Sequence, residues 1–186
     1  MEKLLEDYSP RVLVRTMVFL NSKQFGLKSR MGHRALRCHL PQITLHESPG
    51  ETPHLKYVED VSKSKQGGLK HRRVRRKEVM HYANAILECT RSTRHSAHLR
   101  ETNYLQPRRK YEESDKIWFT KQQMGYNSIQ LVVPDLLRSA GIVGNFTNHS
   151  LRATAATSLY EHGVDEQLIM ERAGHRSVEG YQLEHY

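Results

Sequence analysis

The stretch from Thr147 to Gly180 restricts the fold of this chain more than any other, because it contains two helical patterns with recognisable ends. In the first pattern Leu151, Ala155 and Leu159 recur every four residues, which predicts a helix with one buried face. Gly163 follows at a position where a glycine in the left-handed conformation commonly ends a helix. We therefore predict a helix that stops just before Gly163.

The second pattern begins directly afterwards. Asp165 is a residue type that caps helices, and Leu168 and Ile169 are placed to face the core. Gly174 ends this pattern, so a second, shorter helix is predicted between Asp165 and Gly174.

Two polar residues mark the start of the first helix. His149 and Arg152 are three apart, so on a helix both side chains project to the same side. A helix N-terminus adds free N–H groups and the positive end of the dipole. Together these groups suit a phosphate. The alternative is an ordinary helix with a solvated Arg, because short motifs of this kind are common.

The run 148–156 (NHSLRATAA), followed by Gly174-His175-Arg176-Ser177, resembles the C-terminal part of the tyrosine recombinase (phage-integrase-like) catalytic domain. The sequence of these two motifs is most similar to the Crypton-type branch, which includes domesticated vertebrate proteins such as the C-terminal domains of MYM-type zinc-finger proteins. The resemblance extends over about residues 9–180. It implies an α+β fold, mainly helical, that is tyrosine recombinase catalytic-domain-like with a small antiparallel sheet.

The resemblance also implies a chemistry. In the family a Tyr hydroxyl attacks a DNA phosphate and forms a 3′-phosphotyrosine. Two Arg and a His neutralise the charge on the phosphoryl oxygens, and a Lys protonates the departing 5′-oxygen. No metal or other cofactor is needed. The residues that match these roles are Arg152, His149, His175 and Lys63, with Lys65 as the second choice for the Lys.

The chain departs from the family pattern at two catalytic positions. Lys28 stands in the slot of the first Arg, and Lys keeps the charge but not the planar fork that binds phosphate in a bidentate way. The family Tyr is expected at Glu184, which is flanked by Tyr181 and Tyr186. After Gly180 the sequence no longer resembles that of the family, and we interpret this as a truncated or altered C-terminal end.

The formal charge of +9 and the pI near 9.7 indicate a polyanionic partner, most simply DNA. The densest basic segment is 70–77, which suits DNA phosphates, a nuclear localisation signal or a solvated charge run. The residues expected to contact DNA are Lys65, Lys70, Arg72, Arg73, Arg75, Arg76 and Arg176. No apolar run is long enough for a membrane span or leader, so we expect an intracellular protein. The resemblance to the domesticated Crypton-type proteins implies that it is nuclear.

Only two cysteines occur, and Cys38 with His33 and His39 matches no standard metal site, so no metal is expected. Residues 1–186 are expected to form one domain with a polar insertion at about 90–115. Helices are predicted from Ser9 and Pro10 to near Gly26, weakly at 79–88, and from Ile129 to near Gly141 with a kink or break at Pro134. Antiparallel strands are predicted between Ile43 and Arg75, including a third strand at 69–75, and a short strand at 117–119 after a polar loop.

Three functions remain open at this point. The first is a catalytically degenerate recombinase-like domain that binds DNA in nuclear or transcriptional regulation. Its expected partners besides DNA are other nuclear regulatory proteins and further copies of the chain, as a homo-oligomer on DNA. The second is an active recombinase of a mobile element that breaks and rejoins DNA. The third is a nuclear protein-interaction scaffold.

Overall fold

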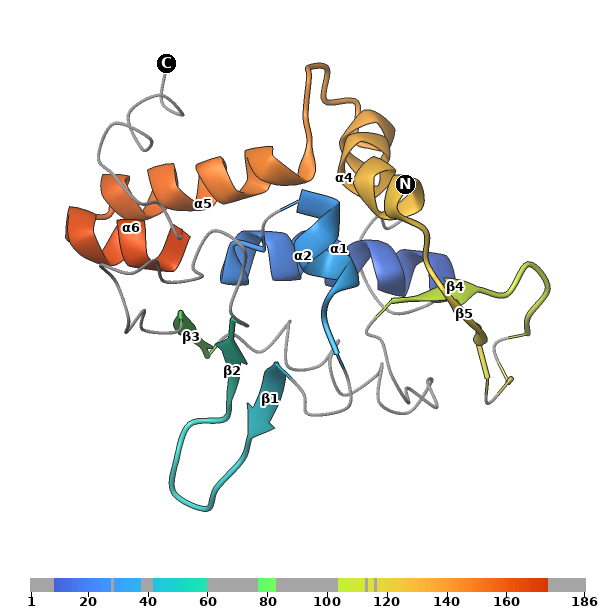
Figure 1. The fold of residues 1–186 in the computed structure, drawn as a ribbon, viewed down its shortest axis with the longest axis horizontal. Helices are drawn as coiled ribbons and strands as arrows, with labels where there is room; N and C mark the ends of the chain where they lie inside the picture. The colour runs from blue at the N-terminus through green and yellow to red at the C-terminus, as the bar shows by residue number, and fades with distance from the viewer. Residues whose placement is uncertain are drawn as a thin grey trace, which may run out of the picture.

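The computed structural model of the chain describes residues 9–27, 29–37, 42–59, 77–82, 104–112, 114–115 and 117–173. Its elements run in the order α1 (Pro10–Phe25), α2 (Ser29–Arg34), β1 (Ile43–His46), β2 (His54–Val58), β3 (Glu78–His81), β4 (Leu105–Pro107), β5 (Phe119–Gln123), α4 (Tyr126–Ser139), α5 (Asn148–Glu161) and α6 (Glu166–Ala173). Figure 1 shows α1 at the centre, with α5 above it, α6 at the left and the β1–β2–β3 sheet below. This arrangement confirms the mainly helical α+β class with a small antiparallel sheet. None of the described helices is long and apolar enough to cross a membrane.

Helix α1 has the boundaries that its sequence predicts. The Ser9 hydroxyl accepts a hydrogen bond from the backbone N–H of Val12 at 3.2 Å, and Pro10 occupies the first turn. The helix ends at Gly26, whose φ of 57° lies in the left-handed region. Along its length Leu13, Val18 and Phe25 are fully buried, so α1 forms the centre of the main core. Burying aliphatic and aromatic side chains of this size contributes about 1.5–3 kcal/mol each.

The three-stranded sheet has the order β1-β2-β3, and both pairs are antiparallel. Leu55 and Tyr57 of β2 and Val79 of β3 are buried, because alternate residues of each strand face α1. The predicted pair between Ile43 and Val58 is confirmed. The predicted third strand at 69–75 lies outside the described residues, and the strand that completes the sheet is β3.

Two predictions for the middle of the chain were wrong. Residues 79–81 are part of β3 and not of a helix, because Val79 pairs with Tyr57 and buries one strand face. Within the region 90–115, which the sequence predicts to be irregular, residues 105–107 form β4. This strand pairs with β5 through a register irregularity, and β5 begins at Phe119 and extends past the predicted 117–119.

Helix α4 begins at Tyr126, before the predicted start at Ile129, and passes Pro134 without a break. Its buried face of Ile129, Val132, Val133 and Leu136 holds both halves of the helix against the core. Pro134 removes the hydrogen bond that an amide at this position would donate to the carbonyl of Gln130. Because Gln130 is exposed, solvent can take the place of that bond, and packing keeps the helix continuous.

The C-terminal helices pack against each other around a second small core. Gly163, with φ of 72°, ends α5, and the Asp165 carboxylate caps α6 by accepting from the N–H of Gln167 at 2.9 Å. Both predictions are confirmed. The predicted faces are partly wrong: Ile169 is fully buried, whereas Leu168 is 58% exposed. Likewise Ala156, and not Ala155, is the alanine of α5 that is buried against α6.

Candidate functional site

The first turn of α5 is fixed by a reciprocal cap. The Thr147 hydroxyl accepts from the N–H of His149 at 3.1 Å, and the N–H of Thr147 donates to the Ser150 hydroxyl at 3.0 Å. The buried Asn148 side chain donates to the carbonyl of Ile129 on α4 at 3.3 Å. These contacts set both the start and the direction of α5, and therefore the positions of the residues that follow.

His149 and Arg152 lie on this fixed part of α5 but in different environments. His149 is exposed at the surface, whereas Arg152 is only 5% exposed. Burying a guanidinium group is costly unless its donors are used, so a buried Arg is a group whose position the fold determines. The structure therefore brings the predicted pair onto adjacent turns of one helix, with the Arg inside and the His at the surface.

A second cluster of polar contacts surrounds the C-terminal end of α1. The Lys77 side chain is buried, with 7% exposed, and its Nζ donates to the carbonyl of Phe25 at 2.6 Å. Arg172 of α6 donates from Nη2 to the carbonyl of Gln24 at 3.3 Å. A Cβ built on Gly26 lies 3.2 Å from Lys77 Nζ and 3.4 Å from the carbonyl oxygen of Arg172. The strand β3, the helix α6 and the end of α1 therefore meet at Gly26.

This meeting point is the common anchor of three chain segments that carry predicted catalytic residues. Lys28 is two residues after Gly26 in the chain. Residues 60–76 directly precede Lys77, and residues 174–186 directly follow the last residue of α6. The predicted residues themselves lie outside the described ranges: Lys28, Lys63, Lys65, Lys70, Arg72, Arg73, Arg75, Arg76, His175, Arg176, Tyr181 and Tyr186. The structure thus shows where their segments start or end, and it places Arg152 and His149 directly.

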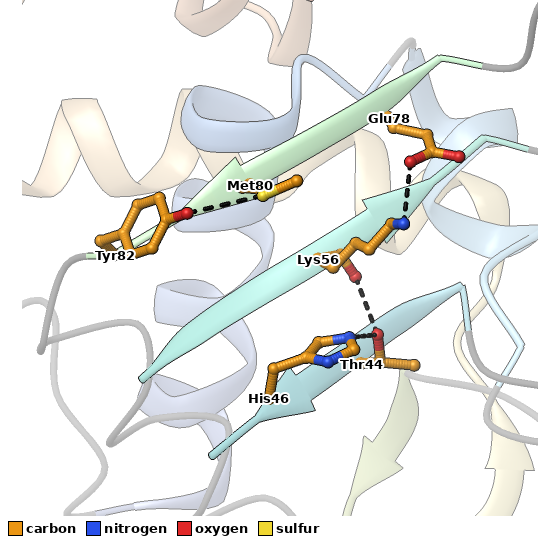
Figure 2. Close-up of polar contacts among 6 residues, drawn as sticks. All are labelled: Thr44, His46, Lys56, Glu78, Met80 and Tyr82. Atoms are coloured by element: carbon orange, nitrogen blue, oxygen red, sulfur yellow. Dashed lines mark hydrogen bonds and ion pairs between the residues drawn. The ribbon is translucent and has the colours of Figure 1, made fainter. Parts of the chain in front are cut away.

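The ends of the 60–76 connection are held together by the sheet. The N–H of Glu59 donates to the carbonyl of Lys77 at 2.9 Å, which continues the β2–β3 ladder past Val58 and Glu78. On the outer face, the ion pair between Lys56 Nζ and Glu78 joins the two strands at 2.8 Å, as Figure 2 shows. The connection therefore leaves from a closed hairpin and not from two separate strands.

Burial and a neighbouring charge shift the pKa of two basic groups near this anchor. Burial lowers the pKa of Arg172 from its usual value. Burial also lowers the pKa of His81 on β3, and the nearby positive charge of Arg172 lowers it further. The ring of His81 lies edge-on to Phe25 at a centroid distance of 6.4 Å. Burial and the neighbouring cation therefore both disfavour the charged form of His81.

Sequence reasoning missed Lys77, because it was included in the basic surface segment 70–77. A signal was nevertheless present. Residues 77, 79 and 81 have the same parity on a strand, and Val79 is apolar, so alternation places Lys77 on the core side. The structure corrects the earlier reading: the last residue of the basic segment is a buried donor to α1 and not a solvated charge.

Comparisons with known proteins agree with this architecture. A crystal structure of the XerH site-specific recombinase bound to difH substrate, in a pre-cleavage complex, superimposes with a TM-score of 0.61 at 15% identity, over 97% of this chain and 45% of that one. A post-cleavage complex of XerH with a palindromic difH substrate gives a TM-score of 0.59 at 15% identity, over 97% of this chain and 44% of that one. The chain thus spans less than half the length of these recombinases, and at this identity the likeness establishes the fold.

No curated protein matches the sequence closely. A family model described as "Phage integrase family" matches residues 60–183, roughly two thirds of the chain. The matched region includes the β2–β3 connection, α4, α5 and α6, and with them every predicted catalytic position except Lys28 and Tyr186. Because this match covers well over half of the sequence, the chain belongs to the phage integrase family, the tyrosine recombinases.

Proposed function

We propose that this domain binds DNA, that it derives from a Crypton-type tyrosine recombinase, and that it acts in the nucleus as a regulator with little or no strand-cleaving activity. The observation that carries the proposal is the meeting of Gly26, Lys77 and Arg172 at the C-terminal end of α1, because these residues flank the three segments in which catalytic residues are predicted. An intact anchor of this kind is expected of a domain that still uses the family surface.

The DNA-binding part of the proposal rests on charge and on position. Residues 60–76 contain seven Lys or Arg and one Asp, in a chain of formal charge +9. The residues that flank this segment, Glu59 and Lys77, are joined by a backbone hydrogen bond of 2.9 Å. The two XerH structures with the same fold contain recombinase bound to DNA substrate. A cluster of this kind binds the phosphate backbone largely without reading the sequence.

The reduced activity follows from two residues of the sequence. Lys28 in place of the first Arg retains charge but not the bidentate fork, and losing one preorganised donor typically costs on the order of a hundredfold in rate. Tyr181 stands three residues before the expected nucleophile position. On a helix this shift is about 4.5 Å along the axis, whereas attack needs an approach of about 3–3.5 Å.

The DNA-binding proposal is tested by the salt dependence of affinity for a short duplex. Neutralising Arg72, Arg73, Arg75 and Arg76 should make the slope of log K against log salt shallower by up to about four units, if all four contact phosphates. A matched control neutralises four exposed residues on described elements: Lys23, Lys110, Lys121 and Arg138. An equal change of slope in both variants would mean that the segment has no special place in the interface.

The alternative of an active recombinase is tested by trapping the covalent intermediate. The protein is incubated with a pool of nicked duplexes of randomised sequence, in which a cleaved end diffuses away, and adducts are separated on a denaturing gel. We expect no adduct. An adduct that disappears with Tyr181→Phe or Tyr186→Phe would establish cleavage and identify the nucleophile.

The nuclear part of the proposal is tested with a fluorescent fusion in cultured cells. The basic segment 70–76 is expected to direct the fusion to the nucleus. Replacing its four arginines with Gln should then leave the fusion distributed through the cell, whereas the four-residue control variant should remain nuclear.

A further inference from the structure

A cleft lies at the end of the molecule away from the Gly26 anchor. It is bounded by the first turns of α1, by α4, and by β4 with the loop that follows it, and its volume is about 820 Å³. In Figure 1 these elements meet at the right-hand end, where the N-terminal half of α1 lies beside β4 and α4. No residue of α5 or α6 lines the cleft, so it is separate from the surface described above.

The floor of this cleft is apolar. Val12 of α1, Val132 of α4 and Met124 line it and are buried in the surrounding structure. At its margin Leu131 is 52% exposed and Tyr111 is 39% exposed. Apolar side chains exposed around a hollow indicate a binding surface more than scattered exposed residues do.

The rim of the cleft is strongly basic. Arg11 and Arg15 are four apart on α1 and therefore lie on one face of the helix, and Arg108 and Arg109 follow β4 on the opposite side. Arg108 donates to the carbonyl of Ile117 at 3.1 Å. Within the described part of the chain the other three arginines have no hydrogen-bond or ion-pair partner.

The lining contains a single acidic residue. Asp135 of α4 contacts Arg138 at 2.8 Å, so its charge is already engaged. Arg108 has a second partner, because its Nη1 lies 4.0 Å from the Asp115 carboxylate. The guanidinium groups of Arg11, Arg15 and Arg109 therefore lie around an apolar floor whose lining offers them no free carboxylate. Guanidinium groups bind carboxylates in a bidentate way, which gives direction as well as charge to the recognition of an acidic ligand.

We propose that this cleft binds a short acidic segment of a partner protein, in which carboxylates flank one or two large apolar side chains. The apolar side chains would cover Leu131 and the valines of the floor, and the carboxylates would pair with the arginines of the rim. A volume of about 820 Å³ is that of a ligand pocket, so the segment contributes a few side chains and not a whole domain.

DNA is the competing ligand, and the shape of the cleft argues against it. Backbone phosphates are satisfied by a broad basic surface that follows the duplex, and they have no apolar group to place against Val12, Leu131 or Val132. A concave site with an apolar floor and a charged rim matches an amphipathic peptide in both respects.

The proposal is tested with a fluorescein-labelled synthetic peptide in which pairs of Glu or Asp alternate with Leu and Phe. Its binding to the full chain is followed by anisotropy. Two control peptides carry Gln and Asn in place of the acids, or Ser in place of the apolar residues. A single-stranded oligonucleotide of equal charge serves as the competitor.

We expect the amphipathic acidic peptide to bind and both control peptides to bind at least about tenfold more weakly. Arg11→Gln with Arg15→Gln should weaken binding by about 2- to 30-fold, as expected for two rim ion pairs. The matched pair Lys23→Gln with Lys110→Gln removes the same charge outside the cleft lining and should change affinity less than about twofold. Leu131→Ser should weaken binding without changing net charge.

Three results would overturn the proposal. Equal binding of the peptide that lacks apolar residues would mean that the arginines attract any polyanion. Full displacement by the oligonucleotide, together with loss of oligonucleotide binding in the Arg11/Arg15 variant, would assign the cleft to nucleic acid. Unchanged affinity in Leu131→Ser, with an unchanged circular dichroism spectrum, would exclude the apolar floor.

Discussion

Replacing His33 with Gln should remove much of the acid sensitivity of this fold between pH 7 and pH 5. His33 of α2 is fully buried, and burial lowers its pKa from 6.5 to about 3. Its Nε2 lies 2.8 Å from the Ser22 hydroxyl, which donates to the carbonyl of Val18 at 2.7 Å, and its Nδ1 lies 3.0 Å from the Tyr104 hydroxyl. Asn21 donates to that Tyr104 oxygen at 2.8 Å.

The network assigns a neutral ring. Because the Ser22 hydroxyl donates onward, it accepts from Nε2–H, and Tyr104 can donate to an unprotonated Nδ1. A second proton on Nδ1 would point at the hydrogen of the Tyr104 hydroxyl, so the hydrogen bond from Tyr104 to Nδ1 would be lost. We therefore expect that the side chain remains neutral in the folded state until the pH is far below the value at which the unfolded chain takes up a proton.

The sign and size of the effect follow from linkage. Below pH 6.5 the unfolded state binds a proton at His33 that the folded state does not, so the free energy of unfolding falls as pH falls. The contribution is complete above pH 6.5 and is lost progressively toward pH 3. Between pH 7 and pH 5 the expected loss from this one group is about 2 kcal/mol.

The assay is urea unfolding, followed by circular dichroism at several pH values in this window. Gln supplies a donor and an acceptor but does not titrate, so His33→Gln lowers stability overall but flattens its pH dependence by about 2 kcal/mol over the window. The chain contains twelve histidines, and the other eleven cancel when the two curves are subtracted. Parallel curves for the two proteins would refute the assignment of a buried neutral His33.

Three further predictions concern the elements that hold the site, each measured by urea unfolding. Lys77→Met should cost about 1–3 kcal/mol, because it leaves the carbonyl of Phe25 without its buried donor; no change would mean that Lys77 is a surface charge. Gly26→Ala should cost about 1–2 kcal/mol, because φ of 57° is unfavourable for a residue with a Cβ. Gly50→Ala is the control, because Gly50 has a φ of 86° and no atom near an added Cβ, so it measures the backbone strain without the close contact with Lys77. Thr147→Ala should cost about 1 kcal/mol through loss of the α5 cap, and Thr154→Ala on the exposed face of α5 provides the comparison.

The features that the sequence predicted correctly are those set by neighbouring residues. Ser9 with Pro10 starts α1, Gly26 and Gly163 end helices, and Asp165 caps α6, and each depends on backbone groups within four positions. The position of Arg152 at the start of α5 was also predictable, because a helix and its cap are local. Its burial at 5% exposed was not predictable, since burial depends on what packs against the helix.

The features that the sequence did not predict depend on distant contacts. The role of Lys77 depends on a carbonyl fifty-two positions earlier in the chain, and the neutral His33 depends on Tyr104, which is seventy-one positions later. Strand β4 exists because β5 pairs with it, and its own short sequence has no clear alternation. Leu168 is exposed because Ile169 and Ala173 fill the space against α5. The periodicity of apolar residues predicted helix α6, but it did not show which of the adjacent residues Leu168 and Ile169 packs against α5.

The anchor at Gly26 bears on the proposed DNA binding, because it holds cations in position without a ligand. Cations gathered at one place repel each other, and an unliganded cluster tends to drive its members apart. Here Lys77 and Arg172 donate to the last carbonyls of α1, where the helix dipole places partial negative charge. Those carbonyls offset part of the repulsion, but not all of it, because the positive charge of Arg172 still lowers the pKa of His81. The end of α1 therefore fixes both cations in position, and such preorganisation is what the proposed binding of DNA phosphates would require.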